Sequence, residues 1–342
     1  MEPKKPRTRE VICEYQPYIL NPPVPPSELR SEAVANDGPT VAAWKETWLA
    51  NIQANKDKFG SFKKSSLGNL YNKFLHRPVI IAGSGPSLRH NVDELKNRNG
   101  IPVISCLHNF HFFEDNDVKP EYYVSLDAGP IVLEEISEGG SKTEDEYWDM
   151  TKDRALIAFI GSDPRLLEKW QGEIYLYNAP VPDEDYENKV DAIEMFRCPV
   201  SSGGNVLGAA LYVAKGFLGA GAIIFIGADF SFDPANNRFH GWDSKYDRSM
   251  GYTVPMFDVF GNKVKTWQSY KNFAQFFNWM SMQVPGFYIN CSEGGCLGSF
   301  AEGNIFTIKQ MDLKDCLDMY NMSRHLKDQA LTPDTAIKKI LF

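Results

Sequence analysis

Residues that could bind a phosphate group lie together in the stretch R-P-V-I-I-A-G-S-G-P-S-L, residues 77–88. The apolar run V-I-I-A is typical of a buried strand, and a loop of small residues follows it: Gly83, Ser84, Gly85, Pro86 and Ser87. Such a loop before a helix gathers backbone N–H groups and the positive end of the helix dipole, which favours an anion. A plain tight turn is the alternative, because Leu88 stands where the dinucleotide fingerprint has its third glycine.

Two further glycine loops follow along the chain, and the second of them comes directly after a predicted strand. The first contains Ser201, Ser202 and Gly203 before a helical pattern that starts at Asn205. Its backbone and hydroxyl donors suit an anion or a sugar hydroxyl. The other contains Glu293 and Gly294, and we expect these two either to bind the ligand or, in the case of Glu293, to cap the turn.

Three side chains could do acid–base or metal chemistry. Asp127 ends the strand pattern E-Y-Y-V-S-L-D, Asp229 follows the strand pattern 223–227, and His240 lies in the polar segment 233–256. A carboxylate or an imidazole can take the proton of a reacting hydroxyl, and carboxylates also bind Mg²⁺. Asp127 fits a helix N-cap or an Asx-turn equally well, and His240 fits a solvated loop residue.

The elements that would position these residues alternate between strand and helix patterns along most of the chain. This alternation predicts an α/β fold: a Rossmann-like, doubly wound, mostly parallel sheet with helices on both faces, together with an N-terminal arm and helices. Ligands of such sheets bind beyond the C-terminal ends of the strands, where Gly83, Ser105, Asp127 and Asp229 are all expected.

Four segments are predicted along the chain. Residues 1–38 form a proline-rich arm that is extended or disordered and could hold a partner, including a second copy of the chain. Residues 39–76 form a helical segment whose aromatic face, with Trp44 and Trp48, indicates core packing rather than a ligand platform. Residues 77–313 form the Rossmann-like domain that contains the glycine loops, and residues 314–342 a helical tail.

Composition excludes several classes of protein. The net charge of −8, with basic residues interspersed among acidic ones, argues against a duplex nucleic-acid partner. Six scattered cysteines without a C-x-x-C pair argue against structural zinc and indicate reduced thiols of a cytoplasmic protein. The apolar stretch 209–228 contains Lys215 and several glycines, so it predicts a buried helix and strand and no membrane span.

The order of the motifs resembles one family. I-I-A-G-S-G-P-S-L, V-S-L-D-A-G-P, V-S-S-G-G-N-V, F-I-G-A-D-F-S-F and N-C-S-E-G-G-C-L-G follow one another as in the 6-hydroxymethylpterin diphosphokinase MptE-like proteins. That family includes motility accessory factor glycosyltransferases. The first and third motifs also resemble bacterial CMP-sialic-acid-dependent sialyltransferases.

The resemblance implies a Rossmann-like transferase that uses a nucleotide. By position, the glycine loop from Gly83 to Ser87 would hold the nucleotide phosphate, and Asn109 would lie near the base or the acceptor. The turn at residues 201–203 would cradle the donor, and Asp127 would bind Mg²⁺ or a ribose. The sialyltransferases have a catalytic histidine shortly before the last long helix, and this chain has none at 256–261, which leaves His240 as the nearby candidate.

Two enzymatic functions and one non-enzymatic function follow. In the first, a nucleotide-sugar such as a CMP-nonulosonic acid donates to a hydroxyl acceptor, and Asp229 or His240 takes the proton. In the second, ATP and Mg²⁺ transfer diphosphate to a hydroxymethyl heterocycle, with Asp127 and Asp229 as metal ligands. In the third, the fold serves as a structural or interaction protein.

Overall fold

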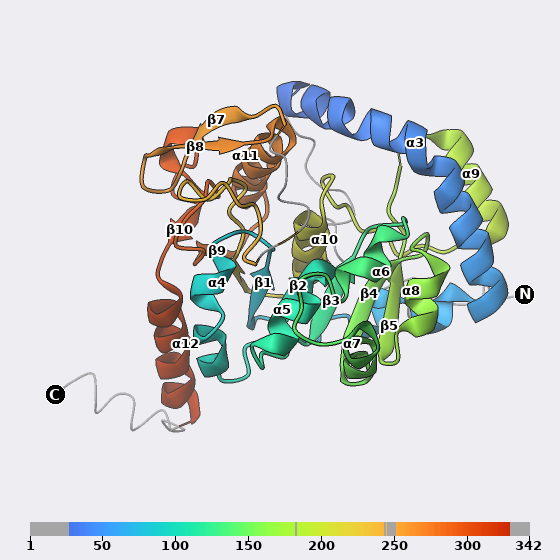
Figure 1. The fold of residues 1–342 in the computed structure, drawn as a ribbon, viewed down its shortest axis with the longest axis horizontal. Helices are drawn as coiled ribbons and strands as arrows, with labels where there is room; N and C mark the ends of the chain where they lie inside the picture. The colour runs from blue at the N-terminus through green and yellow to red at the C-terminus, as the bar shows by residue number, and fades with distance from the viewer. Residues whose placement is uncertain (1–26, 182, 243, 245–250, 329–342) are drawn as a thin grey trace, which may run out of the picture.

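A parallel sheet of eight strands forms the centre of the molecule (Figure 1). The computed structural model describes residues 27–181, 183–242, 244 and 251–328. The sheet order is β10-β9-β6-β1-β2-β3-β4-β5, and every neighbouring pair is parallel. The strands are β1 (Pro78–Ala82), β2 (Val103–Cys106), β3 (Tyr122–Ser125), β4 (Ala155–Phe159), β5 (Glu173–Tyr177), β6 (Ala222–Ile226), β9 (Phe287–Asn290) and β10 (Ile308–Gln310).

The chain order in the sheet creates one switch point. From β1 the chain proceeds through β2, β3, β4 and β5 in one direction, then returns to place β6 on the other side of β1. Ala82 of β1 pairs with Ile226 of β6 at the C-terminal end of this junction. In open parallel sheets the crevice at such a reversal is the usual ligand site.

Helices surround the sheet (Figure 1), so the α/β fold predicted from the sequence is confirmed. The helices of the described chain are α3 (Ser27–Phe59), α4 (Leu88–Asn91), α5 (Phe110–Asp115), α6 (Ile131–Glu135), α7 (Glu144–Met150), α8 (Pro164–Lys169), α9 (Glu184–Ile193), α10 (Val206–Tyr212), α11 (Gln268–Gln283) and α12 (Leu313–Asp328). Several central strands are wholly buried, as are β4 and β6, which explains their continuous apolar runs.

The apolar stretch 209–228 is the helix and strand that its glycines predicted. It contains the end of α10, one π-helical turn over Val213–Phe217, and β6. No helix in the described ranges combines the length and the apolar composition that crossing a bilayer requires.

Several elements are short or irregular. Helix α4 has a single turn, and a 3₁₀ turn over Glu94–Asn97 follows it. The second half of the predicted helical segment 39–76 contains 3₁₀ turns over Phe62–Ser65 and Leu67–Leu70 in place of an α-helix. A separate hairpin pairs β7 (Val254–Phe257) antiparallel with β8 (Lys263–Thr266).

Helix α3 begins earlier than predicted. It starts at Ser27 and continues through Pro39, so residues 27–38 are helical, and the prediction that this part of the arm is extended was wrong. Thr40 lies inside the helix and is not its cap. Residues 1–26 of the predicted arm and 329–342 of the predicted tail lie outside the described residues.

Side-chain amides attach α3 to the carboxyl edge of the sheet. Asn51 Nδ2 donates to the carbonyls of Ala128 and Gly161, each at 3.0 Å, in the loops that follow β3 and β4. Buried Asn55 donates in the same way to two carbonyls of the β4 loop, each at 2.9 Å. Figure 1 shows α3 lying along the outside of the molecule from the α11 region to α9. Buried amide bonds of this kind fix the helix across the strand ends.

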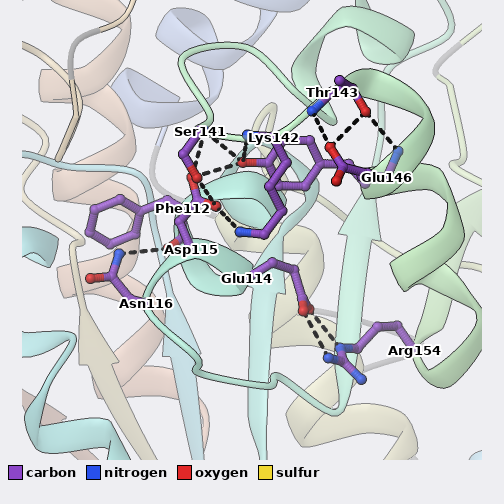
Figure 2. Close-up of polar contacts among 10 residues, drawn as sticks. Phe112, Glu114, Asp115, Asn116, Ser141, Lys142, Thr143, Glu146 and Arg154 are labelled. Carbon is purple, nitrogen blue, oxygen red and sulfur yellow. Dashed lines mark hydrogen bonds and ion pairs between the residues drawn. The ribbon is translucent and has the colours of Figure 1, made fainter.

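A polar network holds the segment that connects α6 and α7 (Figure 2). Asp115, at the end of α5, accepts hydrogen bonds from Tyr147 Oη at 2.7 Å and from the Ser141 N–H at 2.8 Å, and it also pairs with Lys142. Nearby, Arg154 and Glu114 form a buried bidentate pair, with Nε–Oε1 at 2.8 Å and Nη2–Oε2 at 3.0 Å. These contacts fix the position of the segment that begins with α6.

Replacing Asp115 with alanine should lower the free energy of unfolding by about 1–3 kcal/mol at pH 7, because four donor groups of Tyr147, Ser141 and Lys142 lose their acceptor. Burial alone would raise the pKa of Asp115, but bonds from Lys142, Tyr147 and Ser141 lower it to about 2. The stabilisation is therefore present above pH 4 and is lost as the pH falls towards 2. Urea denaturation of both proteins at pH 7 and pH 3 measures this; an equal difference at the two pH values would contradict it.

Candidate functional site

Two cavities open where the strands of the sheet end. The first cavity has a volume of about 330 Å³ and lies over the C-terminal ends of β1, β2, β3 and β6. The second cavity, of about 540 Å³, lies between the loop after β3, α3 and the start of α11. Both walls share Leu126, Asp127, Gly204, Tyr270 and Phe273. Two ligands, one in each cavity, would therefore meet beside Asp127.

The glycine loop after β1 borders the first cavity through Ser84 and Gly85. Its donors are partly used within the protein, since Gly83 N–H donates to the carbonyl of Ile226 at 2.9 Å and Gly85 N–H to that of Gly227 at 2.8 Å. The loop thus closes onto the end of β6. A phosphate in this cavity would need further donors or a cation.

Asp229 is the carboxylate that holds this loop. It is 5% exposed, and Ser87 donates to its Oδ2 through Oγ at 2.7 Å and through the N–H at 3.3 Å. Burial raises the pKa of Asp229 to about 7, against the opposing effect of the Ser87 bonds. Gly85 has to be a glycine, because a Cβ there would lie 2.1 Å from Asp229 Oδ2. Asp229 borders the first cavity and at the same time forms part of the loop structure.

Histidines and carboxylates form another wall of the first cavity. His108 follows β2 and His240 lies in the segment after β6, with their ring centroids 4.9 Å apart. Glu138 lies behind them, with its Oε2 3.5 Å from His108 Nε2, and it accepts a hydrogen bond from Trp242 Nε1 at 3.3 Å. The cluster couples an imidazole that faces the cavity to a carboxylate that can orient it.

Burial changes the acidity of two further carboxyl groups here. Asp127 opens to the cavities but is enclosed by protein, which raises its pKa, while His108 opposes the rise. Burial raises the pKa of Glu135 to about 7; His108 lowers it and Asp127 raises it. Among the described residues no hydrogen bond or ion pair occupies the Asp127 carboxylate. Asp127 is thus available to a ligand.

Three residues at this site were not predicted from the sequence: His108, Glu135 and Glu138. His108 follows the second predicted strand, so the rule that ligands bind at strand ends could have pointed to it. Glu135 and Glu138 lie in and after a short helix and have no local signal. Only the fold brings them to His108.

Charge in the first cavity is mainly acidic. Three carboxylates border it, and no lysine or arginine does so in the part of the chain that the structure describes; Lys245 and Arg248 of the polar segment lie outside that part. Nor do the described residues contain a group of three or more His, Cys, Asp or Glu side chains able to hold a metal ion. Mg²⁺ binding by Asp127 and Asp229 stays a prediction. It fits a Mg²⁺ ion that is coordinated both by these carboxylates and by the phosphate oxygens of a bound nucleotide.

The second predicted loop lies between the two cavities. Ser202 borders the second cavity, and its Oγ accepts a hydrogen bond from the Gly204 N–H at 3.2 Å. Asn205 caps α10 by accepting from the Gly208 N–H at 2.9 Å and borders the first cavity. Neither cavity includes Ser201 or Gly203 in its wall. The turn thus contributes Ser202 to the site, with Gly204 and Asn205 beside it.

Asn109, Glu293 and Gly294 are three further predicted ligand residues that lie outside both cavities. Asn109 is fully buried and donates to the carbonyls of Ala82 and Gly83, which fixes the start of the glycine loop. Glu293 Oε1 accepts hydrogen bonds from the Leu313 N–H at 3.0 Å and from Asn91 Nδ2 at 3.1 Å, so it bonds to the start of α12, a contact that the sequence did not predict. Gly294 packs behind Asp229, where a Cβ would lie 3.6 Å from Oδ1. The structure assigns these residues positioning contacts.

Comparison with known proteins supports the resemblance found in the motifs. The family model for 6-hydroxymethylpterin diphosphokinase MptE-like proteins matches residues 46–234, more than half of the chain. The chain belongs to this family. Membership of the MptE-like family supports a transferase-like enzyme. No curated protein matches the chain.

A solved structure shares the fold of this MptE-like protein. The MAf glycosyltransferase from Magnetospirillum magneticum AMB-1 aligns with a TM-score of 0.51 and 17% sequence identity, over 80% of this chain. The alignment covers 41% of that protein, so this chain spans about two fifths of its length.

Proposed function

We propose that the protein is a transferase that moves a group from a nucleotide-activated donor in the first cavity to a hydroxyl acceptor in the second. The observation that carries the proposal is the meeting of the two cavities at Asp127, whose carboxylate is available there. Membership of the MptE-like family supports the reaction class.

The reaction needs one base at this junction. The acceptor oxygen forms a bond to the transferred group, the bond from that group to a nucleotide phosphate oxygen breaks, and its electron pair leaves with the phosphate. Asp127 takes the acceptor proton. We prefer Asp127 to Asp229 because Ser87 already occupies the Asp229 carboxylate. His108, held by Glu138, lies where it could return a proton to the leaving phosphate.

The nature of the transferred group is a choice between two chemistries. The aromatic wall of the second cavity favours a glycosyltransferase with a nucleotide-sugar donor, since aromatic faces pack well against sugar C–H groups. The acidic first cavity favours the diphosphokinase alternative, in which Mg²⁺ accompanies ATP and offsets the charge of its phosphates. A requirement for divalent metal separates these two reactions.

A thermal-shift screen tests nucleotide binding. The protein is heated with CMP, CDP, UDP, GDP, ATP or a pterin, each with and without Mg²⁺. A ligand at 100 times its Kd should stabilise the protein by about 2.7 kcal/mol and so raise the unfolding midpoint. Protection by CMP without metal supports the glycosyltransferase, protection by ATP only with Mg²⁺ supports the diphosphokinase, and no protection by any compound supports a non-catalytic interaction protein.

Two substitutions place the binding site. Val206 borders only the first cavity and Thr40 only the second. Val206→Trp should fill the first cavity and abolish protection by the nucleotide, whereas Thr40→Trp should leave protection unchanged. Circular dichroism and the unfolding midpoint without ligand show that both variants fold. Full protection in Val206→Trp would contradict the placement.

A further inference from the structure

The wall of the second cavity is largely aromatic. Trp44 and Trp48 come from α3, and Trp267, Tyr270 and Phe273 come from the start of α11. The rings of Trp267 and Tyr270 stack, with centroids 5.2 Å apart and planes 29° apart, and Phe239 also stacks on Tyr270, so these rings hold one another in place.

Protein contacts hold this wall in place without a ligand. The Trp44 ring packs on Gly129, where a Cβ would lie 2.8 Å from the ring, so only glycine leaves room for it. Trp48 packs edge-on against Phe159, with centroids 6.2 Å apart, as a core residue does. Asn51, on the same helix as the two tryptophans, bonds α3 to the loops that follow β3 and β4. The rings are therefore pre-positioned, which reduces the entropy lost when a ligand binds.

Polar groups of the second cavity are few and carry no positive charge. Thr40, Ser202 and Ser269 supply hydroxyl groups, and Asp127 supplies a carboxylate at the boundary with the first cavity. No Lys, Arg or His lines this cavity within the described ranges. An anionic ligand would meet the Asp127 charge without compensation, so the cavity selects against phosphorylated or carboxylated compounds.

We infer that the second cavity binds a neutral sugar ring, and that this sugar is the acceptor of the proposed transfer reaction. One face of a pyranose is rich in C–H groups, whose partial positive charge matches the negative face of an aromatic ring. The ring edge presents hydroxyl groups that can pair with the cavity hydroxyls and with Asp127. The acceptor role rests on the proposed function, whereas sugar binding can be measured by itself.

Tryptophan fluorescence provides the measurement, because three of the seven tryptophans line the cavity. The full chain is titrated with methyl glycosides of glucose, galactose, mannose and N-acetylglucosamine, and with glucose 1-phosphate, glucuronate and choline for comparison. At least one neutral glycoside should give a saturable change with a Kd at or below about 10 mM. The two anionic sugars should bind at least about tenfold more weakly.

Variants assign the signal to the cavity. Trp44→Ala should weaken glycoside binding about tenfold, and Trp44→Phe, which keeps a ring, should restore most of it. Trp44 is 37% exposed, so its truncation leaves the core intact. Thr40→Trp should fill the cavity and abolish binding. Trp148→Phe removes an indole outside the cavity and should leave the Kd unchanged.

Several outcomes would overturn the inference: no saturable change with any neutral glycoside, tighter binding of choline or of an anionic sugar, or full binding in both Trp44→Ala and Thr40→Trp. Failure of the proposed function gives a different pattern. Glycoside binding without nucleotide protection would refute the proposed transferase function and support the sugar site. Nucleotide protection without glycoside binding would refute only the sugar site.

Discussion

Replacing Asp127 with asparagine should slow group transfer by about 10²–10⁴-fold, the range for loss of a general base. The amide keeps the size of the side chain and cannot take a proton. The Kd of the nucleotide, measured by the thermal-shift assay, should therefore stay within about threefold of the wild-type value. Release of CMP from CMP-N-acetylneuraminic acid, or of AMP from ATP, measures the rate for the corresponding donor.

The pH profile provides a second reading of the same experiment. Because enclosure raises the pKa of Asp127, the rate should rise with pH until this carboxyl is ionised, and Asp127→Glu should keep a rising profile at a reduced rate. Glu138→Gln should cost less, about tenfold, because Glu138 acts by orienting His108. Asp185, exposed on α9, provides the control: Asp185→Asn should match wild type. A wild-type rate in Asp127→Asn would rule out Asp127 as the base.

Asp229→Asn should make the protein more stable at pH 8 and leave its stability at pH 4 nearly unchanged. Burial raises the folded-state pKa of Asp229 from 3.8 to about 7. A raised pKa contributes stability that is fully present below the unfolded value and is lost as the pH rises through 7. A difference of about three pKa units corresponds to about 4 kcal/mol of unfolding free energy that the wild type loses at high pH. Asparagine is neutral at every pH, so the variant does not lose it.

Urea denaturation between pH 4 and pH 8 measures this difference, and a neighbouring carboxylate provides a control of opposite sign. Burial alone would raise the pKa of Asp233, but the Ala235 N–H and Arg89 hold it below its usual range. Its stabilisation is present above the unfolded pKa, so Asp233→Asn should destabilise the protein at pH 7. Equal pH dependence of wild type and Asp229→Asn would refute the account of Asp229.

The sheet was largely predictable from local patterns. Strand β1 contains the apolar run V-I-I-A that predicted it, and β6 lies within one residue of the predicted strand pattern 223–227. Side chains buried on both faces leave a continuous apolar run in the sequence.

The long-range contacts of the site were not predictable in the same way. Asp229 bonds to Ser87 across 142 positions of the chain, and neither residue has a pattern that identifies its partner. Glu138 and His108 meet because α6 and the turn after β2 pack together. The start of α3 was misplaced because Gly38 and Pro39 usually end a helix, and here the helix continues through them.

Part of the aromatic wall of the second cavity lies outside the part of the chain shared with the family. Trp44 precedes the matched family region, residues 46–234, and Trp267 follows it, and neither residue borders the first cavity. Substitutions at these two positions can therefore alter what the second cavity admits without changing the wall of the first cavity. Under the proposed function, selection acting there would diversify the acceptor while it preserves the donor.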